Sequence, residues 1–178
     1  SSDGTVYLLK HWYLGRVCDI RQVGELLRAA GQLARLHREL DAVSAEWTPA
    51  GPAGLLPGVR GPLEEIGRHN RELKKVRSFI RGRVAKNEFE YLYLESFEKM
   101  YDMAEKVLER MERSGCEDLY KESMQMGTVI HGDYNYHNLL MLKEGMAVTG
   151  FEHMRVDIQM RDRYYFMRKA MEKQHWKQ

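Results

Sequence analysis

The sequence predicts an α+β fold that is predominantly helical and carries a small β-hairpin late in the chain. Most of the chain up to Met126 has apolar residues at helical spacing, which favours helices. Runs of β-type residues are confined to Thr5–Leu9 and to the segment after Gly127. All four prolines, from Pro49 to Pro62, fall in one glycine-rich stretch, which is typical of a single long connection.

The two ends of the sequence look incomplete. Asp3 and Gly4 form a hairpin-turn signal directly before the Thr5–Leu9 run, and the sequence has no partner strand before that turn. The last residues, through Trp176, continue an amphipathic helix without a stop signal. We therefore expect the sequence to be a fragment of a longer protein.

Helices are expected between these ends. The connector Lys10–Cys18 leads to Asp19, which is a good N-cap for a helix running to about Leu40. A helical stretch over about 63–113 is expected to break near 82–87, since one helix of that length would be unusual. Two apolar rows at helical spacing predict buried faces: Phe89, Tyr93, Phe97, Met100, Ala104, Val107 and Met111, then Met160, Tyr164, Met167 and Met171.

The composition excludes several classes of function. A chain of 178 residues suits one domain, and a formal net charge of +2 is too small to indicate a nucleic-acid partner. The two cysteines, Cys18 and Cys116, lie far apart, so neither a disulfide framework nor a zinc site is expected. No apolar run reaches membrane-spanning length and no signal peptide is evident, so we expect no membrane partner and a cytoplasmic location.

One loop carries a pattern with chemical meaning. It spans residues 131–138, between the β-type run Thr128–Ile130 and a predicted hairpin at 139–149. Phosphoryl transfer needs a carboxylate that orients and deprotonates the attacking hydroxyl, and oxygen ligands that hold magnesium on the phosphates. Asp133 and Asn138 can supply both groups from this loop. The alternative is a plain Asx-turn loop, in which the two side chains satisfy only backbone amides.

His131-Gly132-Asp133 followed by Asn138 resembles the catalytic loop of the aminoglycoside phosphotransferase and choline kinase superfamily. Further stretches are similar to the spore coat protein S (CotS) family of that superfamily: 69–76, 87–90, 157–159, 161–162 and 164–169. The similarity implies the C-terminal lobe of a protein-kinase-like fold. Residues 1–18 would be the last strand of the N-terminal lobe and the hinge, and 19–178 the helical lobe with the loop at 131–138 and the hairpin at 139–149. The rest of the N-terminal lobe would be missing and the C-terminus truncated.

The resemblance also implies roles for individual residues. Asp133 would be the catalytic base and Asn138 a magnesium ligand. His131 would brace the loop, and Asp162 would support it from the following helix. The hinge at 9–14 would meet the adenine ring of ATP, with contacts from Leu9, His11 and Trp12.

Two departures from the superfamily pattern bear on activity. The superfamily has a magnesium-binding aspartate directly before Phe151, where this sequence has Gly150. On an extended strand Glu152 would share the face of Gly150, so it is the candidate substitute for the missing aspartate. Its side chain, however, starts about 6–7 Å farther along the chain. No glycine-rich phosphate loop precedes the hinge, and Lys10 looks like a solvated hinge residue. We expect Mg²⁺ and ATP to be cofactors of a complete protein, and no measurable ATP affinity for this fragment.

Three other features each have two interpretations. His131, Asp133 and His137 suit a transition-metal site as well as a catalytic loop. The basic residues between 71 and 86 suit a polyanion or, given their acidic neighbours, a solvated helix face. The aromatic insert 134–136 suits contact with a substrate or partner, or packing against the last helix.

Two functions follow from these observations. Asp133 and Asn138 favour an ATP- and magnesium-dependent phosphotransferase that acts on a hydroxyl of a small molecule or of a coat protein. Gly150 favours a kinase-derived structural component of the spore coat with degenerate or weak chemistry, and the sequence slightly favours this second function. The expected partners are spore coat proteins or a small-molecule hydroxyl substrate. The expected location is the mother-cell cytoplasm, with deposition on the spore coat.

Overall fold

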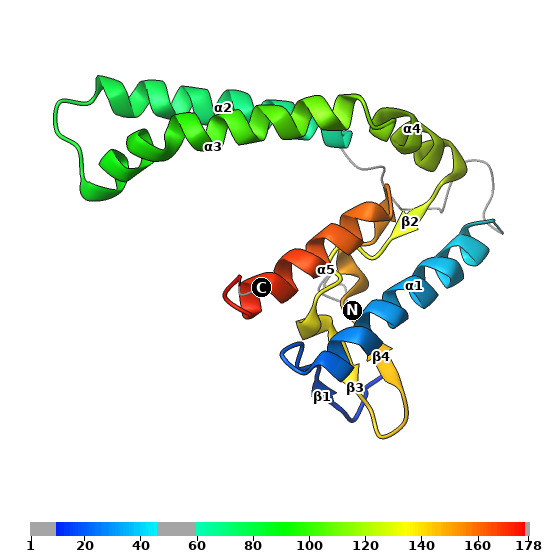
Figure 1. Cartoon of the computed structure of the whole chain (residues 1–178). Helices are drawn as coiled ribbons and strands as arrows, with labels where there is room; N and C mark the ends of the chain where they lie inside the picture. Colours follow the sequence, from blue (N-terminus) through cyan, green and yellow to red (C-terminus); the bar gives the residue numbers. More distant parts are fainter. Residues whose placement is uncertain (1–9, 46–59, 177–178) are drawn as a thin grey trace, which may run out of the picture. The chain divides into compact units, whose positions relative to one another are not determined.

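The computed structural model describes residues 10–45 and 60–176 (Figure 1). The chain divides into two compact units, one from 1–55, 128–155 and 159–178 and the other from 56–127 and 156–158. Among the described helices, none combines the length and the apolar character that a membrane crossing needs. The strand expected at Thr5–Leu9 lies outside the described residues, and so does Leu9 of the expected hinge.

The first unit is built on a three-stranded antiparallel sheet in the order β1-β3-β4. Strands β3 (Leu139–Met141) and β4 (Met146–Val148) form the hairpin predicted at 139–149, with Leu140 opposite Ala147. Strand β1 (Arg16–Val17) pairs with the other edge of β3. This strand was not predicted, because two residues inside a polar connector give no alternating pattern.

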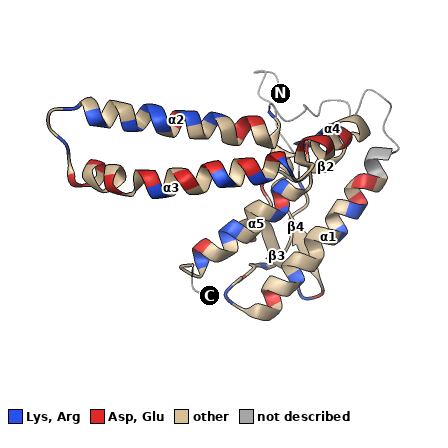
Figure 2. Ribbon diagram, turned by 45° about the horizontal axis from the view of Figure 1, so that its top comes forward, with Lys and Arg blue, Asp and Glu red and all other residues tan. Residues whose placement is uncertain are grey.

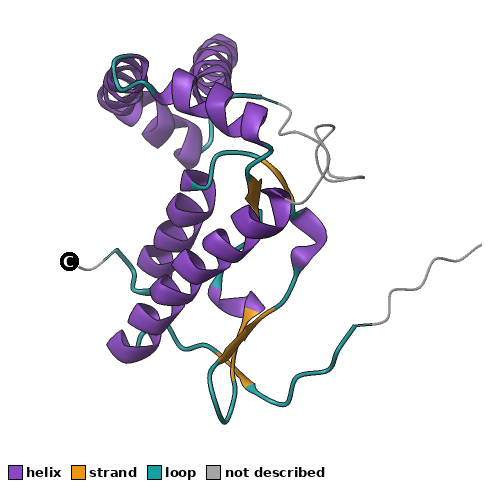
Figure 3. Cartoon of the chain, turned by 90° about the vertical axis from the view of Figure 1, so that its right-hand side faces the viewer, coloured by secondary structure: helices purple, strands orange, loops and turns teal. Residues whose placement is uncertain are grey.

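The remaining strands and turns of this unit are short, and most of the described chain is helical (Figure 3). Strand β2 (Val129–Ile130) pairs with β5 (Arg155–Val156). Two 3₁₀ turns, η1 (Tyr136–Asn138) and η2 (Phe151–His153), follow β2 and β4 respectively.

Two helices flank the sheet of the first unit, α1 (Val23–Ala45) and α5 (Met160–Lys173). Their inward faces join the strands in one apolar core, whose members are Cys18, Ile20, Ala29, Leu33, Leu36, Tyr134, Leu139, Met141, Phe166 and Ala170. The predicted N-cap of α1 is wrong. Asp19 lies in the turn before the helix, where its Oδ1 accepts a hydrogen bond from the Arg21 amide at 3.2 Å.

The second unit contains α2 (Pro62–Gly82), α3 (Glu88–Glu112) and α4 (Cys116–Met126), and α2 and α3 run side by side (Figure 1). The break predicted near 82–87 is confirmed. The start of α3 after this break is fixed by a capping box. Asn87 Oδ1 accepts a hydrogen bond from the Glu90 amide and Glu90 Oε2 accepts one from the Asn87 amide, both at 2.9 Å.

The predicted buried stripe of α3 is only partly correct. Phe97 is buried, whereas Phe89, Met100 and Val107 are exposed. The face of α3 that meets α2 instead includes polar groups, since Glu105 accepts a hydrogen bond from Asn70 of α2 at 2.8 Å. Periodicity identifies residues that share a helix face, but a helix with one partner buries only part of that face.

The basic residues of α2 are balanced by acidic residues of α3 (Figure 2). Arg77 of α2 forms an ion pair with Glu98 of α3, and its guanidinium lies 4.8 Å from the centre of the Phe97 ring. Lys74 lies 4.6 Å from the centre of the Tyr101 ring. These contacts favour the interpretation of a paired, solvated helix face.

Candidate active site

The loop at 131–138 rests on a buried carboxylate of α5. Asp162 Oδ2 accepts a hydrogen bond from the His131 amide at 2.8 Å, and Oδ1 accepts from the Gly132 amide at 2.9 Å. Asp162 is 1% exposed. A buried carboxylate that accepts two consecutive backbone amides fixes the direction in which the loop leaves β2. Asp162 therefore lies where the expected loop support would act.

A histidine of α1 completes this support. His37 Nε2 lies 3.0 Å from Asp162 Oδ2, and both side chains are almost fully buried. The sequence analysis did not identify His37 as part of the site. The signal that would have found it is a polar side chain on the face that carries Leu33, Leu36 and Leu40, since buried polar groups require a partner.

His131 is held on both ring nitrogens. Its Nε2 donates to the Thr149 carbonyl at 2.9 Å, and its Nδ1 accepts from the Asp133 amide at 3.2 Å. This pattern corresponds to the neutral imidazole with the proton on Nε2. Burial is the main cause that lowers the pKa of His131 from its usual value of 6.5. The ring thus ties the loop to the end of the hairpin, as a bracing residue would.

The lowered pKa of His131 predicts a pH dependence of stability. The unfolded chain binds a proton at this histidine below about pH 6.5, whereas the folded chain binds it only at lower pH, so stability falls as the pH drops below about 6.5. Urea unfolding across this range measures the effect. His131→Asn should flatten the pH dependence, and parallel curves for the two proteins would contradict this origin.

Gly132 makes the tight turn after His131 possible. Its φ of 82° lies in the left-handed region, and a Cβ at this position would lie 2.1 Å from the His153 carbonyl oxygen. Only glycine fits, because backbone is present where a side chain would begin.

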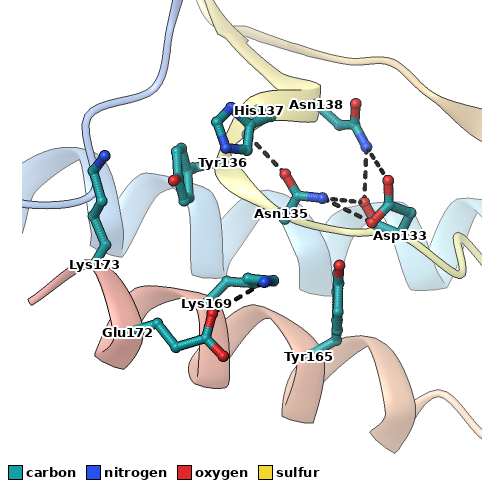
Figure 4. A pocket seen from close by; sticks show the side chains of 9 residues that line it. All are labelled: Asp133, Asn135, Tyr136, His137, Asn138, Tyr165, Lys169, Glu172 and Lys173. Carbon is teal, nitrogen blue, oxygen red and sulfur yellow. Dashed lines mark hydrogen bonds and ion pairs between the residues drawn. The ribbon is translucent and has the colours of Figure 1, made fainter. Parts of the chain in front are cut away.

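Asp133 and Asn138 converge on the same side of the loop (Figure 4). Asn138 Nδ2 donates to Asp133 Oδ2 at 2.9 Å, and Asn135 Nδ2 donates to Asp133 Oδ1 at 2.8 Å. The plain Asx-turn alternative applies to Asn135, whose Oδ1 accepts from the His137 amide at 2.9 Å. The Asp133 carboxylate is instead oriented by two side-chain amides, which leaves it aimed at the neighbouring cavity.

A cavity of about 460 Å³ adjoins these residues. Its walls come from the loop and from α5, and its lining residues are Asp133, Asn135, Tyr136, His137, Asn138, Tyr165, Lys169, Glu172 and Lys173 (Figure 4). Burial is the first cause that raises the pKa of Tyr165, and the charge of Asp133 and a hydrogen bond to it add to this effect. The cavity therefore has a carboxylate at one end and cationic side chains along one wall.

The aromatic insert of the loop has two different environments. Tyr134 is fully buried, donates a hydrogen bond to the Ala29 carbonyl at 2.8 Å and packs against Phe166 with ring centres 5.5 Å apart. Its burial raises the pKa of its hydroxyl. Tyr136 lines the cavity, next to the His137 ring. Packing against α5 therefore holds for Tyr134, whereas Tyr136 is half-buried at the wall of the cavity and its contact with a substrate or partner stays a prediction.

A solved structure matches this architecture. The crystal structure of an aminoglycoside phosphotransferase from Alicyclobacillus acidocaldarius subsp. acidocaldarius DSM 446 aligns with the chain at a TM-score of 0.76 and 17% sequence identity. The chain has an aminoglycoside phosphotransferase-like fold. The match covers 93% of this chain and 47% of the other, so this chain spans about half the length of that structure.

Comparison by sequence adds nothing to this result. No family model matches the chain, and no curated protein matches it. The structural likeness therefore shows the fold, and it does not bear on the resemblance to the spore coat protein S family.

The magnesium site expected from the sequence stays a prediction, and position 150 offers no side-chain ligand to it. Gly150 adopts a φ of 81°, and a Cβ at this position would lie 2.7 Å from Asn138 Cγ and Oδ1. Glu152 is in η2 rather than on an extended strand, so the expectation that it shares a strand face with Gly150 is wrong, and its carboxylate pairs with Lys10. Asn138 offers one amide oxygen, which by itself does not complete a magnesium site.

The alternative of a transition-metal site also lacks support. Within residues 10–45 and 60–176, no group of three or more His, Cys, Asp or Glu side chains is arranged to hold a metal ion. His131 uses both ring nitrogens in hydrogen bonds to Thr149 and Asp133.

The expected hinge residues are described only in part. His11 and Trp12 are exposed, and the His11 ring lies at a tilt to the Tyr13 ring with ring centres 4.7 Å apart. Their expected contact with an adenine ring stays a prediction.

Proposed function

We propose that this protein is a kinase-like phosphotransferase that moves the terminal phosphoryl group of ATP to a hydroxyl. The convergence of Asp133 and Asn138 on one cavity carries this proposal. The buried contacts of Asp162 and His131 support it, because they hold the loop in a fixed geometry before any substrate arrives.

The proposed chemistry uses few groups of this chain. Asp133 accepts the proton of the acceptor hydroxyl while the oxygen of that hydroxyl bonds to the γ-phosphorus. The bond between the γ-phosphorus and the bridging oxygen breaks, and ADP leaves. Asn135 and Asn138 hold the carboxylate in position. Magnesium bound to ATP would supply charge neutralisation on the phosphates, and Asn138 is the residue proposed to face it.

Transfer of label from γ-³²P ATP to hydroxyl-bearing acceptors tests the proposed function. The assay uses the natural full-length protein with and without Mg²⁺, because we propose that residues 1–178 alone bind ATP too weakly to measure. Label should appear in an acceptor only with Mg²⁺. Failure to label any acceptor above a boiled-protein control would refute the proposed activity.

Gly150 favours a second candidate function. Loss of a carboxylate from the metal site removes a full charge where the phosphates need neutralising. On this basis we propose, as the alternative, a kinase-fold structural component of the spore coat with weak or degenerate chemistry. The spore coat setting and its coat-protein partners rest on the sequence resemblance to the spore coat protein S family.

Gly150→Asp distinguishes the two candidates. A carboxylate beside Asn138 should tighten magnesium-dependent nucleotide binding at least about tenfold, which equals ~1.4 kcal/mol. The positive φ and the close Asn138 side chain should lower the free energy of unfolding by about 1–2 kcal/mol. Calorimetric titration of ATP with and without Mg²⁺ measures the first effect, and urea unfolding the second.

Two further variants control this experiment. Gly150→Ala introduces the same Cβ and the same backbone strain without a carboxylate, so it should destabilise the protein and should not tighten nucleotide binding. Glu152→Gln should weaken magnesium-dependent nucleotide binding only if Glu152 already supplies the negative charge that position 150 lacks. If none of the three variants changes magnesium dependence, the metal site is vestigial and the structural function is favoured.

A further inference from the structure

The wall of the cavity opposite the loop is a row of three residues on one face of α5. Tyr165, Lys169 and Lys173 follow one another at intervals of four residues, so each lies about 6 Å beyond the last along the helix axis. Figure 4 shows Tyr165 next to Asp133 and Lys173 at the far end, near Tyr136. The row therefore leads from the proposed base outward, and its two outer members are cationic.

The acidic groups of this cavity are already engaged. Glu172 lies 3.0 Å from Lys169 Nζ and 3.4 Å from Arg168 Nε, and these partners lower the pKa of its carboxyl, with Lys169 as the first cause. Asp133 is held by Asn135 and Asn138. A cationic acceptor would find no carboxylate to pair with except the proposed base itself.

Lys173 keeps its charge available. In the described part of the chain no carboxylate pairs with it, and its Nζ lies 5.3 Å from the centre of the Tyr136 ring. Arg168 and Lys169 share one carboxylate, Glu172, so this group carries a surplus positive charge as well. Arg168, Lys169 and Lys173 outnumber the carboxylates of Glu172 and Asp133 by one, and this net positive charge next to the loop attracts a negatively charged group.

We propose that the acceptor of this phosphotransferase carries an anionic group, a carboxylate or a phosphate, in addition to its hydroxyl. The hydroxyl lies at the Asp133 end of the cavity, and the anionic group lies against Lys169 and Lys173. The placement of the acceptor hydroxyl at Asp133 rests on the proposed function, whereas the placement of the anionic group depends only on residues of α5.

Three small probes that each carry a hydroxyl and differ in charge test the inference: sn-glycerol 3-phosphate, glycerol and choline. Each is titrated without nucleotide into ¹⁵N-labelled protein, and amide shifts are followed at 133–138 and 165–173. Glycerol 3-phosphate should produce saturable shifts in both segments, while glycerol and choline produce none. Tighter binding of choline than of glycerol 3-phosphate would overturn the proposal.

Charge variants locate the anion end. Lys173→Glu should weaken glycerol 3-phosphate binding about tenfold, whereas Lys173→Arg should retain it, because the contact depends on charge. Lys99→Glu on exposed α3 makes the same change of net charge in the other unit and should have no effect. Equal affinity of Lys173→Glu and wild type would refute the assignment.

The same probes distinguish failure of this inference from failure of the proposed function. Asp133→Asn should still bind glycerol 3-phosphate, since the anion end is separate from the base. Anion binding that depends on Lys173 without any phosphoryl transfer would refute the proposed function alone. Transfer to choline in preference to glycerol 3-phosphate would refute the anionic acceptor alone.

Discussion

Asp133→Asn should lower the rate of phosphoryl transfer by about 10²–10⁴-fold, the range that a positioned general base contributes. The substituted amide keeps the size of the side chain and can still accept a hydrogen bond from Asn138, so the loop should remain folded. The initial rate of label transfer at saturating ATP measures the effect. The change should appear in kcat rather than in the affinity for ATP.

A matched variant controls for the loss of one negative charge. Asp102→Asn on the exposed surface of α3 makes the same chemical change away from the cavity and should leave the rate unchanged. An Asp133→Asn protein that retains the wild-type rate would exclude Asp133 as the base and leave the proposed mechanism without a proton acceptor.

Asp162→Ala should lower the free energy of unfolding by about 3–5 kcal/mol, because three buried donors lose their acceptor. These donors are the amides of His131 and Gly132 and the ring of His37. Folded domains are stable by only about 5–15 kcal/mol, so this one change removes a large share of the total. Urea unfolding followed by circular dichroism measures the difference.

Two other variants keep this prediction testable if Asp162→Ala does not fold. Asp162→Asn retains one acceptor oxygen and should fall between the wild type and the alanine variant. Asp102→Ala removes an exposed aspartate and should shift stability by no more than about 0.5 kcal/mol. If Asp162→Ala and Asp102→Ala are equally stable, the buried carboxylate does not support the loop.

The hairpin, the split between α2 and α3, and the convergence of Asp133 with Asn138 were predictable from the sequence. Each depends on residues close together in the chain: a turn between two apolar runs, a break in a helical pattern, or five residues of one loop. Local spacing limits where such side chains can lie, so a single sequence is sufficient to place them.

Features that depend on contacts between distant segments were missed or misassigned. His37 and Asp162 are 125 residues apart, and no local pattern connects them. In α5 the predicted apolar row, which includes Met160 and Met167, is exposed, whereas Asp162 and Phe166 of the opposite face are buried. The spacing showed that the row shares a face, but a buried carboxylate that needs three donors places the opposite face inward.

The support beneath the loop has a consequence for how such a sequence drifts over generations. His131, Gly132 and Asp162 serve folding whether or not the chemistry occurs, so purifying selection for a folded chain is enough to keep them. The Asp133 carboxylate contacts side-chain amides at the cavity, and its loss would leave the buried support intact. In a lineage that abandoned phosphoryl transfer, substitutions would accumulate at Asp133 well before they accumulate at Asp162.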